Sequence, residues 1–162
     1  MPSPVSVSSP APSSRSSDRA PLRYDVARAI RGEPITIYGD GFQVRDALFI
    51  DDAVAAWLSA LDRIDEVSGR VFNLGGGTAN TISLREMMAL IAELRGELPM
   101  VAFAEWRPGD QPWYVSDIRR ISAALDWTPK VGLPEGLRAL EHWLEKRFGR
   151  PTRMPALREA RA

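Results

Sequence analysis

Three charged side chains, Arg107, Asp110 and Arg45, are the best candidates for chemistry in this 162-residue sequence. Arg107 and Asp110 flank Pro-Gly in the segment 105–114, "EWRPGDQPWY". Pro-Gly is the preferred central pair of a type II turn, which brings its first and fourth residues to within about 7 Å. An arginine can hold a phosphate through two parallel hydrogen bonds, and a carboxylate can accept from ribose hydroxyls. The pattern predicts a nucleotide clamp; alternatively, Arg107 and Asp110 pair with each other and close the turn.

Arg45 stands at the head of an apolar segment in "QVRDALFIDD", residues 43–52. A charge beside an apolar strand is costly unless it is paired. Arg45 therefore either pairs with Asp46 or faces the anion of a ligand. Asp51 and Asp52 resemble a catalytic carboxylate pair, but they lie where a helix is expected to begin, which favours a capping role.

The composition excludes several other kinds of site. The chain has no cysteine and a single histidine, so a disulfide framework, a thiol nucleophile and a zinc site of the usual His/Cys type are not expected. His142 has no evident Ser or Asp partner and is predicted to be a surface or half-packed residue. The net charge is zero, with 21 basic and 21 acidic residues, which argues against a nucleic-acid or anionic-membrane partner. No apolar run approaches the roughly 20 residues that span a bilayer, and the cytoplasm is the expected compartment.

A glycine-rich loop is the candidate for a cofactor-binding site. Residues 70–91, "RVFNLGGGTANTISLREMMALI", run from a β-like segment through three glycines into a helical pattern. A dinucleotide fingerprint needs Gly-x-Gly-x-x-Gly directly before the helix. Gly75 and Gly77 match the first two glycines, but the third position is Asn80, and the helix starts only at Ser83. We interpret the loop as a glycine-rich exit from a buried strand.

The elements that must position these residues follow from hydrophobic spacing and from capping residues. Residues 34–50 are predicted to form two strands joined by a hairpin at Asp40-Gly41. Further strands are expected at 71–75 and 99–106. Helices are expected at 25–33, 51–64, 83–96 (with a Ser83/Glu86 capping box and a stop at Gly96), 116–127 (capped by Ser116) and 133–149 (with Pro134 in its first turn). Alternating strands and helices indicate an α/β or α+β fold.

The chain is expected to divide into three parts. Residues 1–20 are rich in Ser and Pro and nearly devoid of large apolar side chains, so they are predicted to be a disordered leader. Residues 21–149 form the folded region. Residues 150–162 contain two prolines without a sustained pattern and are predicted to be a flexible tail.

Three motifs follow one another along the chain: "GEPITIYGDGFQVRDALFIDDAVAAWLSAL", "GRVFNLGGGTANTISLREMMALI" and "WRPGDQPWYVSDIRRISAALDWTPKVGLPEGL". In this order they resemble the C-terminal, substrate-binding half of the extended short-chain dehydrogenases/reductases, the NAD-dependent nucleotide-sugar epimerases and dehydratases. The resemblance covers roughly residues 22–148. It implies a fragment of a Rossmann-type enzyme with a nucleotide-diphosphate sugar as ligand. Arg45 and Arg107 would bind the diphosphate and Asp110 the nucleoside, and residues 71–75 would be a late strand of the Rossmann sheet.

The family's cofactor and catalytic motifs have no counterpart here. No Gly-x-x-Gly-x-x-Gly precedes residue 71. The family's catalytic pair is Tyr-x-x-x-Lys, whereas the three tyrosines here are followed four positions later by Arg28, Phe42 and Ile118. The resemblance therefore implies NAD in the intact family but neither a cofactor site nor a catalytic residue in this chain. The alternative is a non-catalytic binding or interaction protein derived from the same fold.

An isolated half of such a fold should expose apolar surface. If the sheet neighbours of residues 71–75 are missing, Val71, Phe72 and Leu74 lose part of their cover, as does the helix that bears Trp57 and Leu61. Exposed apolar side chains and an unpaired strand edge favour association. We therefore expect self-association or a separate Rossmann half as partner.

Overall fold

The computed structural model describes residues 22–149. The helices are α1 (Leu22–Ile30), α2 (Ile50–Asp62), α3 (Ile64–Val67), the 3-10 turn η1 (Thr78–Asn80), α4 (Leu84–Arg95), α5 (Arg119–Leu125) and α6 (Leu133–Phe148). The strands are β1 (Ile35–Tyr38), β2 (Val44–Asp46), β3 (Thr81–Ser83), β4 (Val101–Ala104) and β5 (Trp113–Tyr114). This mixture of helices and small sheets confirms the α/β (α+β) class. The predicted leader (1–20) and tail (150–162) lie outside the described residues.

Two small sheets replace the predicted hairpin. β1 pairs in parallel with β4, and β2 pairs antiparallel with β3 and parallel with β5. The hairpin prediction is therefore wrong, although both segments are strands. Gly39 and Gly41 have φ values of 87° and 81°, and the Asp40 carboxylate accepts from the Phe42 N–H at 2.9 Å. This five-residue connection, 39–43, takes the chain out of one sheet and into the other.

Residues 71–75 are not a strand in the structure, which corrects the strand prediction. Their burial nevertheless alternates as in a strand, with Val71 exposed and Phe72 and Leu74 half-buried against a neighbouring core. No described strand lies beside this segment in a ladder. A strand is defined by its ladder partner, so a β-like sequence without one remains extended backbone.

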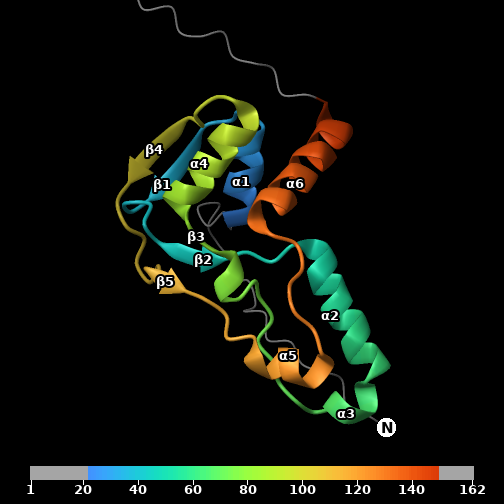
Figure 1. The fold of residues 1–162 in the computed structure, drawn as a ribbon. Coiled ribbons are helices and arrows are strands. Elements are labelled where there is room, and N and C mark those ends of the chain that lie inside the picture. The colour runs from blue at the N-terminus through green and yellow to red at the C-terminus, as the bar shows by residue number, and fades with distance from the viewer. Residues whose placement is uncertain (1–21, 150–162) are drawn as a thin grey trace, which may run out of the picture.

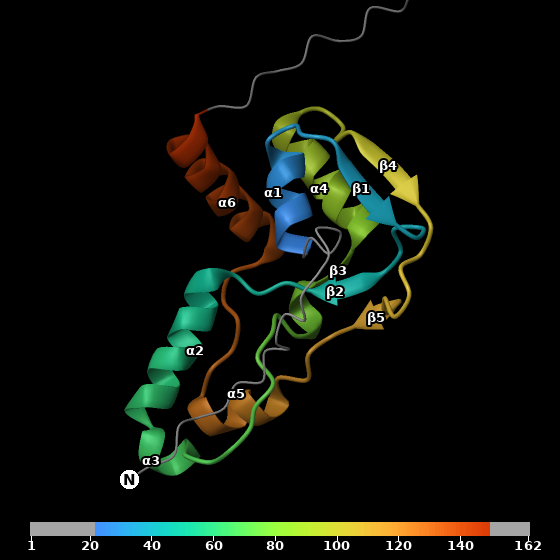
Figure 2. The ribbon, with the colours of Figure 1, turned by 180° about the vertical axis from the view of Figure 1, so that it is seen from behind.

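The described residues form two separate apolar cores. The helices that carry the first core, α1, α4 and α6, lie in the upper part of Figures 1 and 2, and those that carry the second, α2, α3 and α5, lie in the lower part. The first core joins α1, α4 and α6 over β1 and β3, and Ile30 and Ile91 are its largest fully buried side chains. The second core joins α2, α3 and α5 around Ala56, Ile121 and Trp127. The candidate residues Arg45, Arg107 and Asp110 belong to neither core.

Local signals predicted some helix ends correctly. The capping box is present, since the Ser83 hydroxyl accepts from the Glu86 N–H and the Glu86 carboxylate accepts from the Ser83 N–H. Gly96 ends α4 in the left-handed conformation at φ 71°, and Pro134 lies in the first turn of α6. Ser116, in contrast, does not cap α5, which begins only after Ile118.

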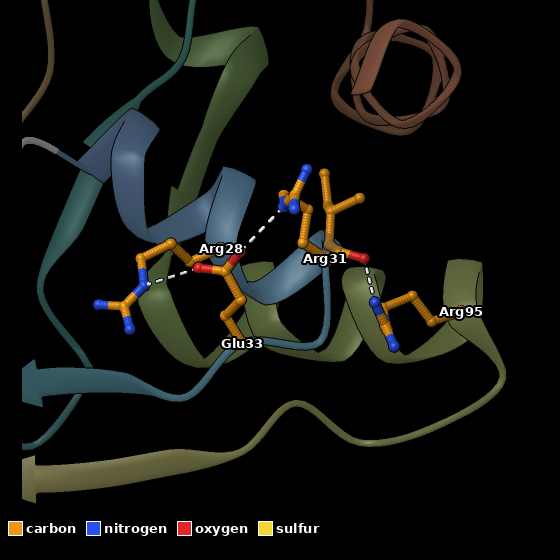
Figure 3. Close-up of polar contacts among 5 residues, drawn as sticks. Arg28, Arg31, Glu33 and Arg95 are labelled. Atoms are coloured by element: carbon orange, nitrogen blue, oxygen red, sulfur yellow. Dashed lines mark hydrogen bonds and ion pairs between the residues drawn. The ribbon is translucent and has the colours of Figure 1, made fainter. Parts of the chain in front are cut away.

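Three arginine side chains make polar contacts around the C-terminal end of α1 (Figure 3). The Glu33 carboxylate accepts from Arg31 at 2.9 Å and from Arg28 at 3.3 Å. The guanidinium of Arg95, at the end of α4, donates to the carbonyl of Ile30 at the end of α1. A cation at this position donates to a carbonyl that has no partner within the helix. It also interacts favourably with the negative, C-terminal end of the helix dipole. This cluster is structural and lies apart from the three candidate residues.

Candidate functional site

The structure joins two of the three candidate residues directly. Because β5 lies beside β2, the turn that precedes β5 reaches Arg45. The Arg45 Nη2 donates to the Asp110 Oδ1 at 3.1 Å, and its Nη1 donates to the Val44 carbonyl at 2.7 Å. Their side chains are 22% and 32% exposed, so the pair remains within reach of solvent. The sequence had suggested other partners for both residues.

Arg45 does not pair with its neighbour Asp46. Successive side chains of a strand point to opposite faces, so adjacent residues of β2 diverge. The Asp46 carboxylate instead accepts from the backbone N–H of Gly77 at 3.0 Å. Of the two alternatives for Arg45, the pairing with Asp46 is therefore wrong, and the guanidinium lies on the side of the sheet that carries the Arg-Pro-Gly-Asp turn.

The Arg-Pro-Gly-Asp turn has the predicted form. The Asp110 N–H donates to the Arg107 carbonyl at 3.1 Å, and Gly109 has the positive φ, 80°, that a type II turn requires. The Arg107 side chain does not close the turn. Its guanidinium carbon lies 3.5 Å from the centroid of the Tyr38 ring, a stacked cation–π contact. The turn thus presents Arg107 on an aromatic face and binds the second arginine, Arg45, through Asp110.

Tyr38 is a site neighbour that sequence reasoning missed. It is the last residue of β1 and precedes the Gly-Asp-Gly connection. Gly39 next to it leaves room for the Trp106 ring, because a Cβ at position 39 would lie 2.5 Å from that ring. A tyrosine at the end of a strand just before a glycine turn was the only sequence signal. The site therefore combines two arginines, one carboxylate and an aromatic ring.

The glycine loop does not fit the pyrophosphate of a dinucleotide. Added Cβ atoms would lie 2.4 Å from the Asp46 carboxylate at Gly75 and 2.0 Å from the Ala47 carbonyl at Gly76. These glycines allow the chain to approach itself closely. The N–H of Gly77 is already bound to a carboxylate, which repels phosphate. Close packing against β2 therefore explains the glycines, and the residues of this loop do not fit NAD.

Asp51 and Asp52 differ in role although they are adjacent. Both lie in the first turn of α2, but the N-cap is Phe49, and no side chain caps the helix. The buried Asp52 carboxylate accepts from the backbone N–H groups of Lys130 and Val131, at 3.0 and 2.9 Å. The capping prediction is therefore wrong for both residues, and Asp52 instead holds the loop that leads to α6. The sequence signal for the burial of Asp52 was its position one helical turn before Ala56, the buried apolar residue of α2.

Other sites of chemistry are not found in the part of the chain that the structure describes. His142 is exposed on α6, in agreement with the prediction. Residues 22–149 contain no group of three His, Cys, Asp or Glu side chains suited to a metal ion. None of the helices in that range is long and apolar enough to cross a membrane. A cavity of about 430 Å³ between α1, α6 and residues 46–50 is mainly apolar and includes neither arginine of the site.

Comparisons with known proteins agree with the motifs. Residues 3–75 match the model of the NAD dependent epimerase/dehydratase family. The chain is 34% identical over 111 residues to CDP-paratose 2-epimerase of Salmonella typhi, which covers 68% of this chain and 33% of that protein. It is 37% identical over 116 residues to dTDP-glucose 4,6-dehydratase of Streptomyces griseus, covering 71% of this chain and 34% of that protein. The chain thus spans about a third of the length of these relatives.

Solved structures give the same result. MoeE5 in complex with UDP-glucose and NAD aligns with a TM-score of 0.69 at 32% identity, over 76% of this chain and 40% of that one. UDP-glucuronic acid 4-epimerase from Bacillus cereus, in complex with UDP-glucuronic acid and NAD, aligns with a TM-score of 0.69 at 27% identity, over 76% and 39%.

The resemblance to the C-terminal part of the extended short-chain dehydrogenases/reductases, in the NAD-dependent epimerase/dehydratase family, is therefore confirmed. Among the relatives is CDP-paratose 2-epimerase, which the combination of "GDGFQVRD" and "WRPGDQPWYVSD" also resembles.

Proposed function

We propose that this chain is the sugar-nucleotide-binding part of an NAD-dependent nucleotide-sugar epimerase or dehydratase of the CDP-paratose 2-epimerase type. Arg45 and Arg107 would bind the diphosphate and Asp110 the nucleoside. The observation that carries the proposal is the ion pair between Arg45 and Asp110 at 3.1 Å, which connects the two predicted binding motifs in one place.

The chemistry of the site supports this ligand class. A nucleotide-diphosphate sugar offers two phosphates to cationic groups and ribose hydroxyls to an acceptor. Guanidinium groups suit phosphates because their N–H groups match two phosphate oxygens at once. Tyr38 holds the Arg107 guanidinium by its flat face, and this contact leaves the N–H edges of the group available.

Under this proposal the chain by itself carries out no catalytic step. NAD serves the intact family, and the chain contains neither a Tyr-x-x-x-Lys pair nor a glycine loop that fits a pyrophosphate. We expect the 162-residue chain to bind a sugar nucleotide and to leave it unchanged. A CDP-hexose incubated with the chain and NAD should show no epimer by NMR, and turnover would contradict this part of the proposal.

Isothermal titration calorimetry with CDP-glucose and UDP-glucose tests the binding itself. Loss of a bidentate charged contact costs about 2 kcal/mol or more, so Arg107→Ala should weaken binding at least thirtyfold. Arg107→Lys should recover only part of the affinity because it keeps the charge without the fork. Arg119→Ala is the matched control, since Arg119 is an exposed arginine paired with Asp117 on another part of the surface.

The alternative is a non-catalytic interaction protein that has kept the fold without the ligand. Under this alternative the wild-type chain binds neither CDP-glucose nor UDP-glucose at millimolar concentration. The exposed apolar surface of α2 is the observation that favours it, because such surfaces mark protein contacts. Wild-type calorimetry therefore separates the two functions.

A further inference from the structure

The connection 39–43 joins the two segments that carry the arginines of the site. It follows directly after Tyr38, which contacts Arg107, and it leads into β2, which carries Arg45. Both of its glycines have positive φ. Glycine has access to more backbone conformations than other residues, so the sequence of the connection alone does not fix its shape. Contacts with the rest of the chain are needed to fix it.

The two ends of the connection have partners of their own. The Gly39 N–H donates to the Ala104 carbonyl at 2.8 Å, and the buried Gln43 donates through its Nε2 to the last carbonyl of β1 at 2.6 Å. The middle, residues 40–42, is different. Within residues 22–149, its hydrogen bonds to other segments come from Arg85 alone.

Arg85, in the first turn of α4, contacts the middle of the connection from outside. Its backbone N–H donates to the Gly41 carbonyl at 3.0 Å, and its Nε donates to the Asp40 carbonyl at 2.7 Å. Its guanidinium carbon lies 4.7 Å from the centroid of the Phe42 ring and 5.3 Å from that of the Phe103 ring. Both distances are typical of a cation–π contact. Arg85 therefore contacts the connection and β4 at the same time.

Local helix preferences do not explain an arginine at this position. Since α4 begins at Leu84, Arg85 is its second residue, where the positive end of the helix dipole repels a cation. Its side chain is exposed and forms no salt bridge with any residue of 22–149. A residue that is unfavourable locally is expected where the tertiary structure or the function requires it. The contacts with the connection and with β4 meet that requirement.

We propose that Arg85 is a positioning residue of the sugar-nucleotide site, which fixes the connection 39–43 and thereby the places of Tyr38 and Arg45. This inference rests on the proposed function. The contact with Phe103 extends the effect to the other segment of the site, because Phe103 lies four positions before the arginine of the Arg-Pro-Gly-Asp turn. One guanidinium thus holds the chain that leads to each arginine of the site.

Calorimetry with CDP-glucose and UDP-glucose measures the expected effect on affinity. Side chains that are already ordered lose fewer rotamers on binding, and for two arginines this corresponds to about tenfold in Kd. Arg85→Ala should therefore raise the Kd about tenfold. Arg85→Lys should recover only part of this loss, because lysine keeps the charge without the Nε donor and the flat guanidinium. Full recovery by lysine would show that only the charge matters and would overturn the proposal.

A double-mutant cycle distinguishes positioning from direct contact with the ligand. A residue that acts through Arg107 has less effect once Arg107 is absent. Arg85→Ala should therefore raise the Kd by a smaller factor in the Arg107→Ala background than in the wild type. Equal factors in both backgrounds would mean that Arg85 acts independently of Arg107, and the positioning role would be wrong.

The ligand-free chain gives a second readout, by NMR. Because the Arg107 side chain lies on the Tyr38 ring, the ring current should shift its δ-proton resonance upfield, and Tyr38→Leu defines the unshifted value. Arg85→Ala should move this resonance at least halfway to the Tyr38→Leu value. Arg119→Ala, an exposed arginine on another part of the surface, is the control and should leave the resonance in place.

Urea unfolding of the same variants tests for a merely structural role. The exposed position of Arg85 predicts a midpoint close to that of the wild type. A large fall in the midpoint with an unchanged Arg107 resonance would overturn the proposal. Failure of the proposed function is distinguishable from this result. A wild-type chain that binds neither nucleotide would contradict the proposed function, and the resonance would still decide whether Arg85 orients Arg107.

Discussion

Arg45 and Asp110 are 65 positions apart in the sequence, and their side chains form an ion pair at 3.1 Å. The pair exists because the two-residue strand β5 runs parallel to β2, with Val44 opposite Trp113 and Arg45 opposite Tyr114. One carboxylate thereby orients an arginine from a distant segment, while the neighbouring Arg107 is held by Tyr38. Both proposed phosphate-binding groups are thus oriented by other side chains of the same site.

A double-mutant cycle on Arg45→Ala and Asp110→Asn separates stability from binding. Because both side chains are partly exposed, we expect the pair to contribute only about 0.2–1 kcal/mol to the free energy of unfolding, measured in urea. The affinity for CDP-glucose or UDP-glucose should fall at least tenfold in Arg45→Ala. A loss of stability above about 2 kcal/mol with unchanged affinity would instead make the pair structural.

Gly76→Ala should destabilise the chain through a steric clash. An added Cβ would lie 2.0 Å from the backbone carbonyl oxygen of Ala47, which cannot rotate away. Forced overpacking typically costs about 1–3 kcal/mol in the free energy of unfolding. Gly132→Ala is the matched control, because its Cβ would meet no atom closer than 4.0 Å; it should cost about 1 kcal/mol or less. Equal stability of the two variants would refute the packing explanation of the glycine loop.

Asp52→Ala should cost far more stability than Asp51→Ala. Both residues lie in the first turn of α2, so both substitutions remove a similar favourable interaction with the helix dipole, about 0.3–1 kcal/mol. Only Asp52→Ala also leaves the backbone N–H groups of Lys130 and Val131 without their acceptor. We expect an additional loss of about 2 kcal/mol or more, measured as a difference in urea unfolding between the two variants. Similar losses in both would show that the loop before α6 does not depend on this carboxylate.

The capping box of α4 predicts a specific dependence of stability on pH. Hydrogen bonds from the Ser83 hydroxyl and backbone N–H hold the pKa of Glu86 below its ordinary value of 4.5. The carboxylate therefore stays ionised to lower pH in the folded chain than in the unfolded one. Its contribution is fully present above about pH 4.5 and is lost as the pH falls through the lowered pKa.

Urea unfolding at pH 6 and pH 3 measures this effect. Glu86→Gln should lose less stability between the two pH values than the wild type, because the variant has no carboxylate to protonate at this position. Glu93→Gln, an exposed position on the same helix, is the control and should keep the wild-type dependence. An identical pH dependence of all three proteins would show that the capping box is not linked to folding.

The amino-acid sequence by itself determined the features that depend on neighbouring residues. The capping box at Ser83 and Glu86, the glycine stop at Gly96 and the turn at Pro108-Gly109 each involve residues within about four positions, and all are present. Local steric and hydrogen-bonding preferences are sufficient for such features. The ordered motifs also indicated the family correctly.

Only the tertiary structure decided which distant groups meet. The pattern of residues 34–50 predicted a hairpin, but β1 pairs with β4. The β-like residues 71–75 pair with none of the described strands. Arg45 had Asp46 next to it and pairs instead with Asp110. Ladder partners and long-range ion pairs depend on how the chain packs as a whole, since strand pairing joins any two segments of suitable pattern. Local pattern therefore supplied the candidate residues Arg45 and Asp110, and the placement of β5 beside β2 brought these two together.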